Sequence, residues 1–165
     1  MPESIYIETT IPSYLAAEPS LRKLVAMHQQ LTRRWWDEKR HECELFTSSV
    51  VLDEAADGDE ATAERRLRFL DGIPLLDLNE EAEALGEALL KTGAVPAIAD
   101  RDALHIAIAC VHEIDCVLTW NCKHIANPHQ QRKLLKEVQK LGYELPALTT
   151  PEQLLLTENE FPNID

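Results

Sequence analysis

Short apolar runs alternate with longer segments of mixed polarity along the whole chain. The short runs, such as SIYI at 4–7 and DCVLTW at 115–120, are bounded by polar or turn-forming residues, which is typical of buried strands. The pattern predicts five strands, at 4–7, 43–47, 74–78, 115–120 and, as an edge strand, 145–150.

The longer segments carry apolar residues at helical spacing. In residues 21–42 the apolar positions recur every three or four residues, as in an amphipathic helix. Further helices are predicted at 50–56, with Ser48 or Ser49 as the cap, and at 60–71, 80–92, 99–111 and 129–142, with a last turn after Thr150. Residues 8–20, which contain two prolines, are predicted to form a loop with one helical turn.

This alternation of strands and helices is typical of βαβ units. It predicts an α/β fold, a three-layer sandwich with a central parallel β-sheet. The 165 residues suffice for one compact domain and are few for two. We assign residues 1–155 to a single domain and residues 156–165 to a polar C-terminal tail.

The composition is that of a globular protein, with 45% hydrophobic residues. No stretch approaches the roughly 20 apolar residues that a membrane span needs, and the first residues lack the regions of a signal peptide. We therefore expect a cytoplasmic protein without a membrane partner. The formal net charge of −13 argues against non-specific nucleic-acid binding through a basic face, but acids that hold divalent cations remain compatible with a nucleic-acid enzyme.

The four cysteines offer one alternative metal site. His112, Cys116, Cys122 and His124 lie close enough in sequence to form a zinc cluster. Their spacing matches no usual zinc motif, and Cys116 opens an apolar run, where a cysteine behaves as a small hydrophobe. The sequence therefore favours free cysteines.

Polar residues follow the predicted strands at the points where sites form in open α/β sheets, at the carboxyl ends of the strands. Glu8 follows the first strand, Glu54 lies in the helix after the second, and Asn121 follows the fourth. Asp102 lies near the start of the helix before the fourth strand, and this start lies at the same edge because a crossover helix runs antiparallel to the strands. Asp115 enters the fourth strand from the opposite end and is a poor candidate.

Each of these residues also has an ordinary interpretation, as a loop acid, a helix-start acid or a turn residue. Their convergence on one edge favours a site, and oxygen ligands of this kind suit Mg²⁺ or Mn²⁺. The sequence contains no glycine-rich dinucleotide motif, no P-loop and no nucleophile elbow.

Four segments resemble, in order and spacing, the motifs of PIN-domain proteins: IYIETTIPSYLA, TSSVVLDEA, ADRDALHIAIA and CVLTWNCKHIAN. Within that superfamily the chain is most similar to the VapC-like toxins of bacterial toxin–antitoxin systems. The resemblance spans about residues 4–155 and implies a metal-dependent ribonuclease.

The resemblance places the catalytic residues at Glu8, Glu54, Asp102 and Asn121, with the first three as ligands of Mg²⁺ or Mn²⁺. The chain departs from the family at two of these positions, because Glu8 and Asn121 stand where aspartates are usual. Asn121 can offer a carbonyl oxygen but cannot act as a base. A catalytically weakened scaffold that binds protein or RNA is therefore the alternative to an active enzyme.

The resemblance also implies partners: an RNA substrate, an antitoxin protein and a second copy of the chain in a homodimer. We expect helix 21–36, with Trp35 and Trp36, to supply the dimer or antitoxin surface. As a stacking platform for bases these tryptophans are the less favoured interpretation, and as core or interface residues the more favoured one. His105, three residues after Asp102, is expected to pack beneath the acids and to hydrogen-bond a carboxylate or the backbone, rather than to bind the metal.

Overall fold

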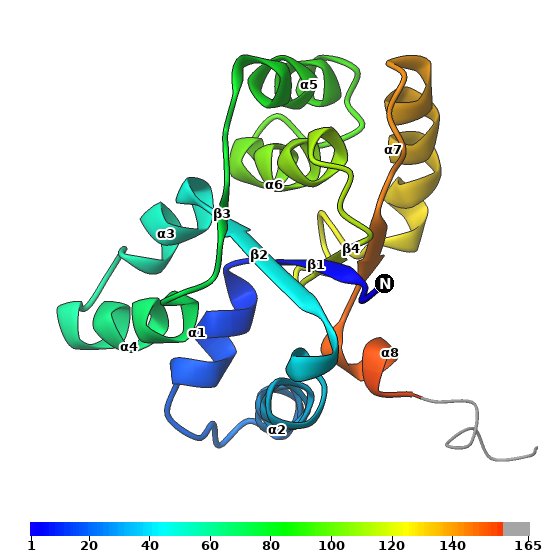
Figure 1. The fold of residues 1–165 in the computed structure, drawn as a ribbon. Helices are drawn as coiled ribbons and strands as arrows, with labels where there is room; N and C mark the ends of the chain where they lie inside the picture. The colour runs from blue at the N-terminus through cyan, green and yellow to red at the C-terminus, as the bar shows by residue number, and fades with distance from the viewer. Residues whose placement is uncertain (157–165) are drawn as a thin grey trace, which may run out of the picture.

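The computed structural model describes residues 1–156, and its centre is a sheet of five parallel strands in the order β3-β2-β1-β4-β5. The strands are β1 (Ser4–Ile7), β2 (Glu44–Ser48), β3 (Leu75–Leu76), β4 (Cys116–Leu118) and β5 (Ala147–Thr149). All five predicted strands are present, and the parallel sheet is confirmed (Figure 1).

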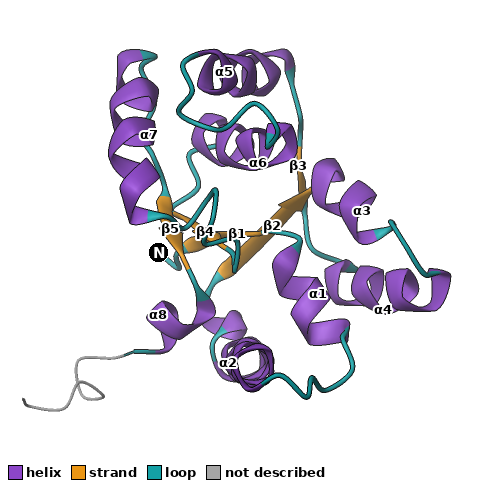
Figure 2. Ribbon diagram, turned by 180° about the vertical axis from the view of Figure 1, so that it is seen from behind, coloured by secondary structure: helices purple, strands orange, loops and turns teal. Residues whose placement is uncertain are grey.

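Helices cover both faces of this sheet (Figures 1 and 2). One face carries α5 (Glu80–Lys91), α6 (Asp100–Val111) and α7 (Pro128–Lys140). The other carries α1 (Thr10–Ala16), α2 (Lys23–Glu38), α4 (Glu60–Leu70) and α8 (Pro151–Leu155), while α3 (Ser49–Ala55) starts directly at the end of β2. The predicted three-layer α/β sandwich is therefore confirmed.

Burial explains why the central strands are nearly continuous apolar runs. Ile5, Tyr6 and Ile7 in β1 are fully buried, as is the whole of β4. A parallel strand with helices on both faces has no solvent side, so its sequence does not alternate between apolar and polar residues.

Side-chain caps fix where several helices begin. Ser48 caps α3 by accepting a hydrogen bond from the Val51 amide, so Ser48 rather than Ser49 is the cap. Thr150 forms a capping box with Gln153 at the start of α8, with Pro151 in the first turn. These caps satisfy amides that have no partner inside the helix.

Two segments differ from the sequence prediction. The segment predicted as a loop with one helical turn contains the seven-residue helix α1, in which Pro12 occupies the first turn and is buried with Ile11 and Leu15. Proline needs no hydrogen-bonded amide there, so it does not break the helix. Helix α2 ends at Glu38, and a short 3-10 turn (Arg40–Glu42) completes the predicted segment.

Trp35 and Trp36 belong to the core, because only 1% and 6% of their surfaces are exposed. The expectation that they form a dimer or antitoxin surface is therefore wrong. The exposed apolar side chains of this segment lie earlier, at Leu21, Leu24 and Met27. No helix in residues 1–156 has the length and apolar character to cross a membrane.

The predicted tail begins at Leu156, and the rest of it, residues 157–165, lies outside the described residues.

Candidate active site

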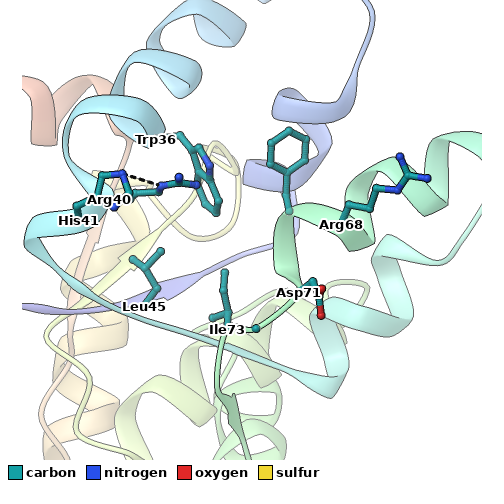
Figure 3. A pocket seen from close by; sticks show the side chains of 9 residues that line it. Trp36, Arg40, His41, Leu45, Arg68, Asp71 and Ile73 are labelled. Carbon is teal, nitrogen blue, oxygen red and sulfur yellow. Dashed lines mark hydrogen bonds between the residues drawn. The ribbon is translucent and has the colours of Figure 1, made fainter.

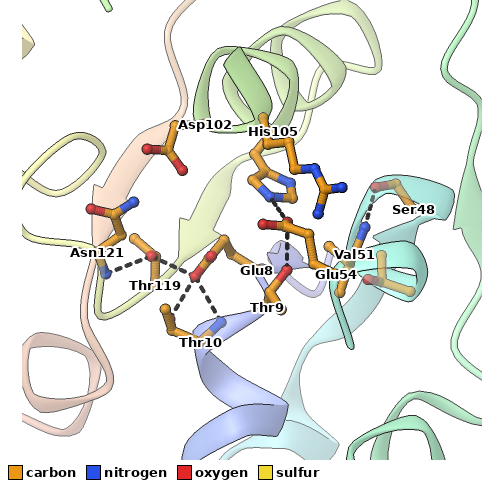
Figure 4. A network of polar contacts seen from close by, with 12 residues as sticks. Glu8, Thr9, Thr10, Ser48, Val51, Glu54, Asp102, His105, Thr119 and Asn121 are labelled. Atoms are coloured by element: carbon orange, nitrogen blue, oxygen red, sulfur yellow. Dashed lines mark hydrogen bonds and ion pairs between the residues drawn. The ribbon is translucent and has the colours of Figure 1, made fainter. Parts of the chain in front are cut away.

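The four candidate residues come from four elements and lie around one region of the sheet edge (Figure 4). Glu8 directly follows β1, Glu54 lies in α3, Asp102 is in the first turn of α6, and Asn121 lies in the loop after β4. Asp115 is at the other end of β4, where its Oδ2 accepts a hydrogen bond from the Ser4 amide at 2.8 Å. The candidate residues thus lie at the carboxyl ends of the strands and Asp115 at the opposite end, as predicted from the strand directions.

Glu8 is the most deeply buried of the four, with 3% of its surface exposed. Its Oε2 accepts hydrogen bonds from the Thr10 amide at 3.0 Å, the Thr10 hydroxyl at 2.5 Å and the Thr119 hydroxyl at 2.7 Å. Burial raises the pKa of Glu8 above its ordinary value, against the opposing effects of His105 and these hydrogen bonds. A nearby cation would oppose this shift, because a positive charge favours the ionised carboxylate.

Glu54 behaves in the opposite way. Its Oε1 accepts hydrogen bonds from His105 Nε2 at 2.5 Å and from the Thr9 hydroxyl at 2.8 Å. Burial alone would raise the pKa of Glu54, but His105, Thr9 and the charge of Arg101 together hold it below its ordinary value. Glu54 is thus an ionised carboxylate whose orientation is fixed.

His105 links Glu54 to a buried hydrogen-bond chain. The ring is fully buried, its Nδ1 lies 2.7 Å from the Tyr6 hydroxyl, and that hydroxyl lies 2.7 Å from Ser48 Oγ. Because a carboxylate only accepts, Nε2–H donates to Glu54 in either protonation state of the ring. His105 therefore packs beneath the acids and hydrogen-bonds a carboxylate, as expected.

Asp102 has a histidine partner of its own. His124 Nδ1 lies 2.8 Å from Asp102 Oδ2, and both side chains are partly exposed. Neither His124 nor Tyr6 was selected as a site residue from the sequence. Tyr6 lies within the apolar run of the first strand, where the sequence does not single it out, and the sequence presents His124 only as a possible zinc ligand.

Asn121 organises the turn that carries His124. Its Oδ1 accepts a hydrogen bond from the His124 amide at 3.0 Å, and its backbone oxygen accepts from the amides of Ile125 and Ala126. Its own amide donates to the Thr119 hydroxyl, which in turn donates to Glu8. The side-chain oxygen of Asn121 therefore has a structural partner within the loop, as is common for asparagine in turns.

The carboxylate oxygens of the three acids are ligands of the kind that a hard cation prefers. One oxygen of each acid, Oε1 of Glu8, Oε2 of Glu54 and Oδ1 of Asp102, accepts no hydrogen bond from the described residues. Within residues 1–156, however, no three His, Cys, Asp or Glu side chains are grouped closely enough to hold a metal ion together. A cation would therefore rest on one or two carboxylates and on water, which is a usual arrangement for Mg²⁺.

Within residues 1–156 the four zinc candidates do not form such a group either, since Cys116 is buried inside β4 while Cys122 is exposed. His112 Nε2 is instead 2.8 Å from the backbone oxygen of Asp77, and His124 contacts Asp102.

A separate hollow of about 430 Å³ has Trp36, Arg40 and His41 among its walls (Figure 3). It lies toward the amino ends of the strands, because Leu45 near the start of β2 and Ile73 just before β3 also line it. The acids lie at the carboxyl ends, so the two regions are distinct.

Comparison with known proteins supports the fold. No protein-family model and no curated protein sequence matches the chain. Among solved structures, it is similar to a chain in the crystal structure of VapBC2 from Rickettsia felis bound to a DNA fragment from their promoter. The TM-score is 0.53 at 16% identity, and the match covers 73% of this chain and 89% of that chain. At this identity the likeness is one of fold.

Proposed function

We propose that the protein is a metal-dependent endoribonuclease of the PIN type. The observation that carries this proposal is the gathering of Glu8, Glu54, Asp102 and Asn121, residues up to 113 positions apart, at the carboxyl edge of the sheet. The sequence motifs on which these residues lie, and a fold similar to that of a VapBC2 chain, support it. The reaction is hydrolysis of an RNA phosphodiester bond.

Glu8, Glu54 and Asp102 would hold Mg²⁺ or Mn²⁺, directly or through water. When bound, such an ion lowers the pKa of a coordinated water and stabilises charge on the phosphate oxygens. The remaining work falls to the protein. His105 and Thr9 keep Glu54 ionised and oriented, His124 holds Asp102, and the Thr119 hydroxyl fixes Glu8.

The test is cleavage of single-stranded and structured RNA in the presence of Mn²⁺. Asp102→Asn should abolish cleavage, because it removes a charge that the cation needs while keeping the size of the side chain. Asp115→Asn is the matched control, since this acid lies at the opposite end of β4. Equal cleavage by the wild type and Asp102→Asn would refute the assignment and identify a contaminating nuclease.

The alternative is a catalytically weakened scaffold that binds protein or RNA. It is favoured by Asn121, which cannot act as a base and whose Oδ1 accepts from the His124 amide. Calorimetric titration with Mn²⁺ separates the two functions, because the scaffold predicts no binding at millimolar metal. If Asn121→Asp gains both affinity and cleavage, the natural site is a weakened one.

We further propose that the protein is the toxin of a toxin–antitoxin pair, acts in the cytoplasm, and is a homodimer that an antitoxin protein inhibits. The similarity to a chain of the VapBC2 structure supports this role. Expression of the chain in a bacterial host should arrest growth, and Asp102→Asn should relieve the arrest. Equal toxicity of the two proteins would contradict a toxin that acts by cutting RNA.

A further inference from the structure

A cavity of about 670 Å³ lies beside the loop that carries Asn121. Trp120 and Cys122, the residues on either side of Asn121, both line it. Its other walls come from His28 on α2, Gln131 on α7, and β5 with the residues directly before and after it. The cavity therefore adjoins the acidic site and is large enough for one nucleotide unit.

Two stacked aromatic rings form one wall. The rings of His28 and Trp120 are 3.9 Å apart between centroids and 14° from parallel, and Tyr14 meets both edge-on. Trp120 is buried and held at both ends, because its amide donates to Thr10 and its indole N–H donates to Thr32. His28 is partly exposed, so it presents a flat ring on a rigid support.

The aromatic wall is linked directly to the acids. Thr10 Oγ1, which accepts from the Trp120 amide at 2.8 Å, donates to Glu8 Oε2. A group that stacks on His28 is therefore positioned by the same elements that position Glu8.

The charges of the residues that line the cavity indicate which kind of group it can bind. Among the described residues no lysine or arginine lines it, and Glu152 does. A phosphate group would meet a carboxylate there and no permanent cation, whereas a neutral ring would meet aromatic and amide groups.

We propose that this cavity takes an unpaired nucleobase of single-stranded RNA, stacked on His28 and next to the phosphate that is cut. The proposal rests on the proposed ribonuclease function and adds to it a binding site for one base beside the phosphate that is cut. Aromatic side chains bind the bases of single-stranded RNA in this way because every base has a flat face.

The test uses Asp102→Asn protein, which should leave RNA intact, and a labelled single-stranded oligoribonucleotide followed by fluorescence anisotropy at fixed ionic strength. Adding His28→Leu should weaken binding about tenfold, the usual scale for one stacked base. Adding His28→Phe, which keeps an aromatic face, should leave affinity within about twofold of the parent. His41→Leu is the matched control, because His41 is exposed and lines the hollow of Figure 3.

Oligoribonucleotides that each lack one base distinguish base stacking on His28 from a merely structural effect of its substitution. In the parent protein, removing one particular base should weaken binding, and in His28→Leu removing that same base should have no further effect. If no position behaves in this way, the cavity does not bind a base. If the wild type cleaves RNA but no base depends on His28 for its effect on binding, the base site alone is overturned. If one base does depend on His28 but the wild type does not cleave RNA, the ribonuclease alone is overturned. If the parent does not bind single-stranded RNA, the base site is overturned, and cleavage by the wild type decides separately on the ribonuclease.

Discussion

Glu8 and Glu54 lie at the same edge of the sheet, but their pKa values are shifted in opposite directions. Burial dominates at Glu8 and raises its pKa, whereas His105, Thr9 and Arg101 lower that of Glu54. In the unfolded chain both acids have a pKa of about 4.3. Glu54 therefore stabilises the fold above that pH, and this contribution is lost as the pH falls through its lower folded pKa. For Glu8 the unfolded state loses its proton first, so stability falls as the pH rises from about 4.3 to the raised folded pKa.

This sign predicts the effect of Glu8→Gln. In metal-free protein at pH 7 the substitution should raise the free energy of unfolding by about 1–2 kcal/mol, because glutamine lacks the ionisation that burial makes less favourable in the folded state than in the unfolded chain. At pH 4 the gain should vanish. Mn²⁺ should raise the melting temperature of the wild type and not that of the variant, as expected for a ligand that binds only the folded state.

Thermal unfolding at the two pH values, with and without Mn²⁺, measures all of these effects. Glu44→Gln, on an exposed residue of β2, is the control. A variant less stable than the wild type at pH 7 would show that Glu8 is not under strain from its burial.

At the scale of elements, the start of α3 joins the fold to the site. Ser48 caps this helix and also contacts the Tyr6 hydroxyl, so one side chain fixes both the helix that carries Glu54 and the chain that leads to His105. Asn79 caps α5 through the Ala82 amide and has no described side-chain partner in the site. Asn79 therefore only caps a helix, whereas Ser48 caps a helix and also supports the site, so comparing the two distinguishes these contributions.

Ser48→Ala should destabilise the protein by about 2 kcal/mol, about 1 for the cap and about 1 for the lost hydrogen bond to Tyr6. Asn79→Ala should cost only the cap, about 1 kcal/mol. Urea unfolding with unchanged m-values measures both. Equal losses in the two variants would mean that the Tyr6 contact contributes nothing to stability.

The elements also mark how far sequence reasoning reaches. Hydrophobic spacing placed all five strands, because buried parallel strands are short apolar runs. It predicts only one helical turn where α1 has seven residues, because proline usually disfavours a helix, whereas Pro12 falls in the first turn, where it is tolerated. It places Trp35 and Trp36 on a helix as core or interface residues, but it cannot decide between the two because it does not show which side of the helix the rest of the molecule covers.

At the scale of the whole molecule, parallel topology brings the site residues together. The sequence could predict that Glu8, Glu54, Asp102 and Asn121 share an edge, since strand direction alone decides this. It could not predict that His105 would contact both Tyr6 and Glu54, or that His124 would contact Asp102, because side-chain partners depend on how helices and loops pack. The stacked pair of His28 and Trp120 joins α2 to the loop after β4 and was missed for the same reason.

The association of two copies is a property of the whole molecule, and its surface suggests where to test it. With the tryptophans in the core, the exposed apolar side chains here are Leu21, just before α2, and Leu24 and Met27 in its first turns. Leu24 and Met27 lie three residues apart on one helix face, and 63% and 51% of their surfaces are exposed.

If the homodimer forms through this face, light scattering at micromolar concentration should give twice the chain mass of 18.7 kDa. Leu24→Lys should reduce it to a single chain without lowering the melting temperature, because Leu24 is not part of the core. Leu135→Lys, at an exposed leucine of α7, is the control and should stay dimeric. A wild-type mass of one chain would contradict the homodimer, and a dimeric Leu24→Lys would place the interface elsewhere.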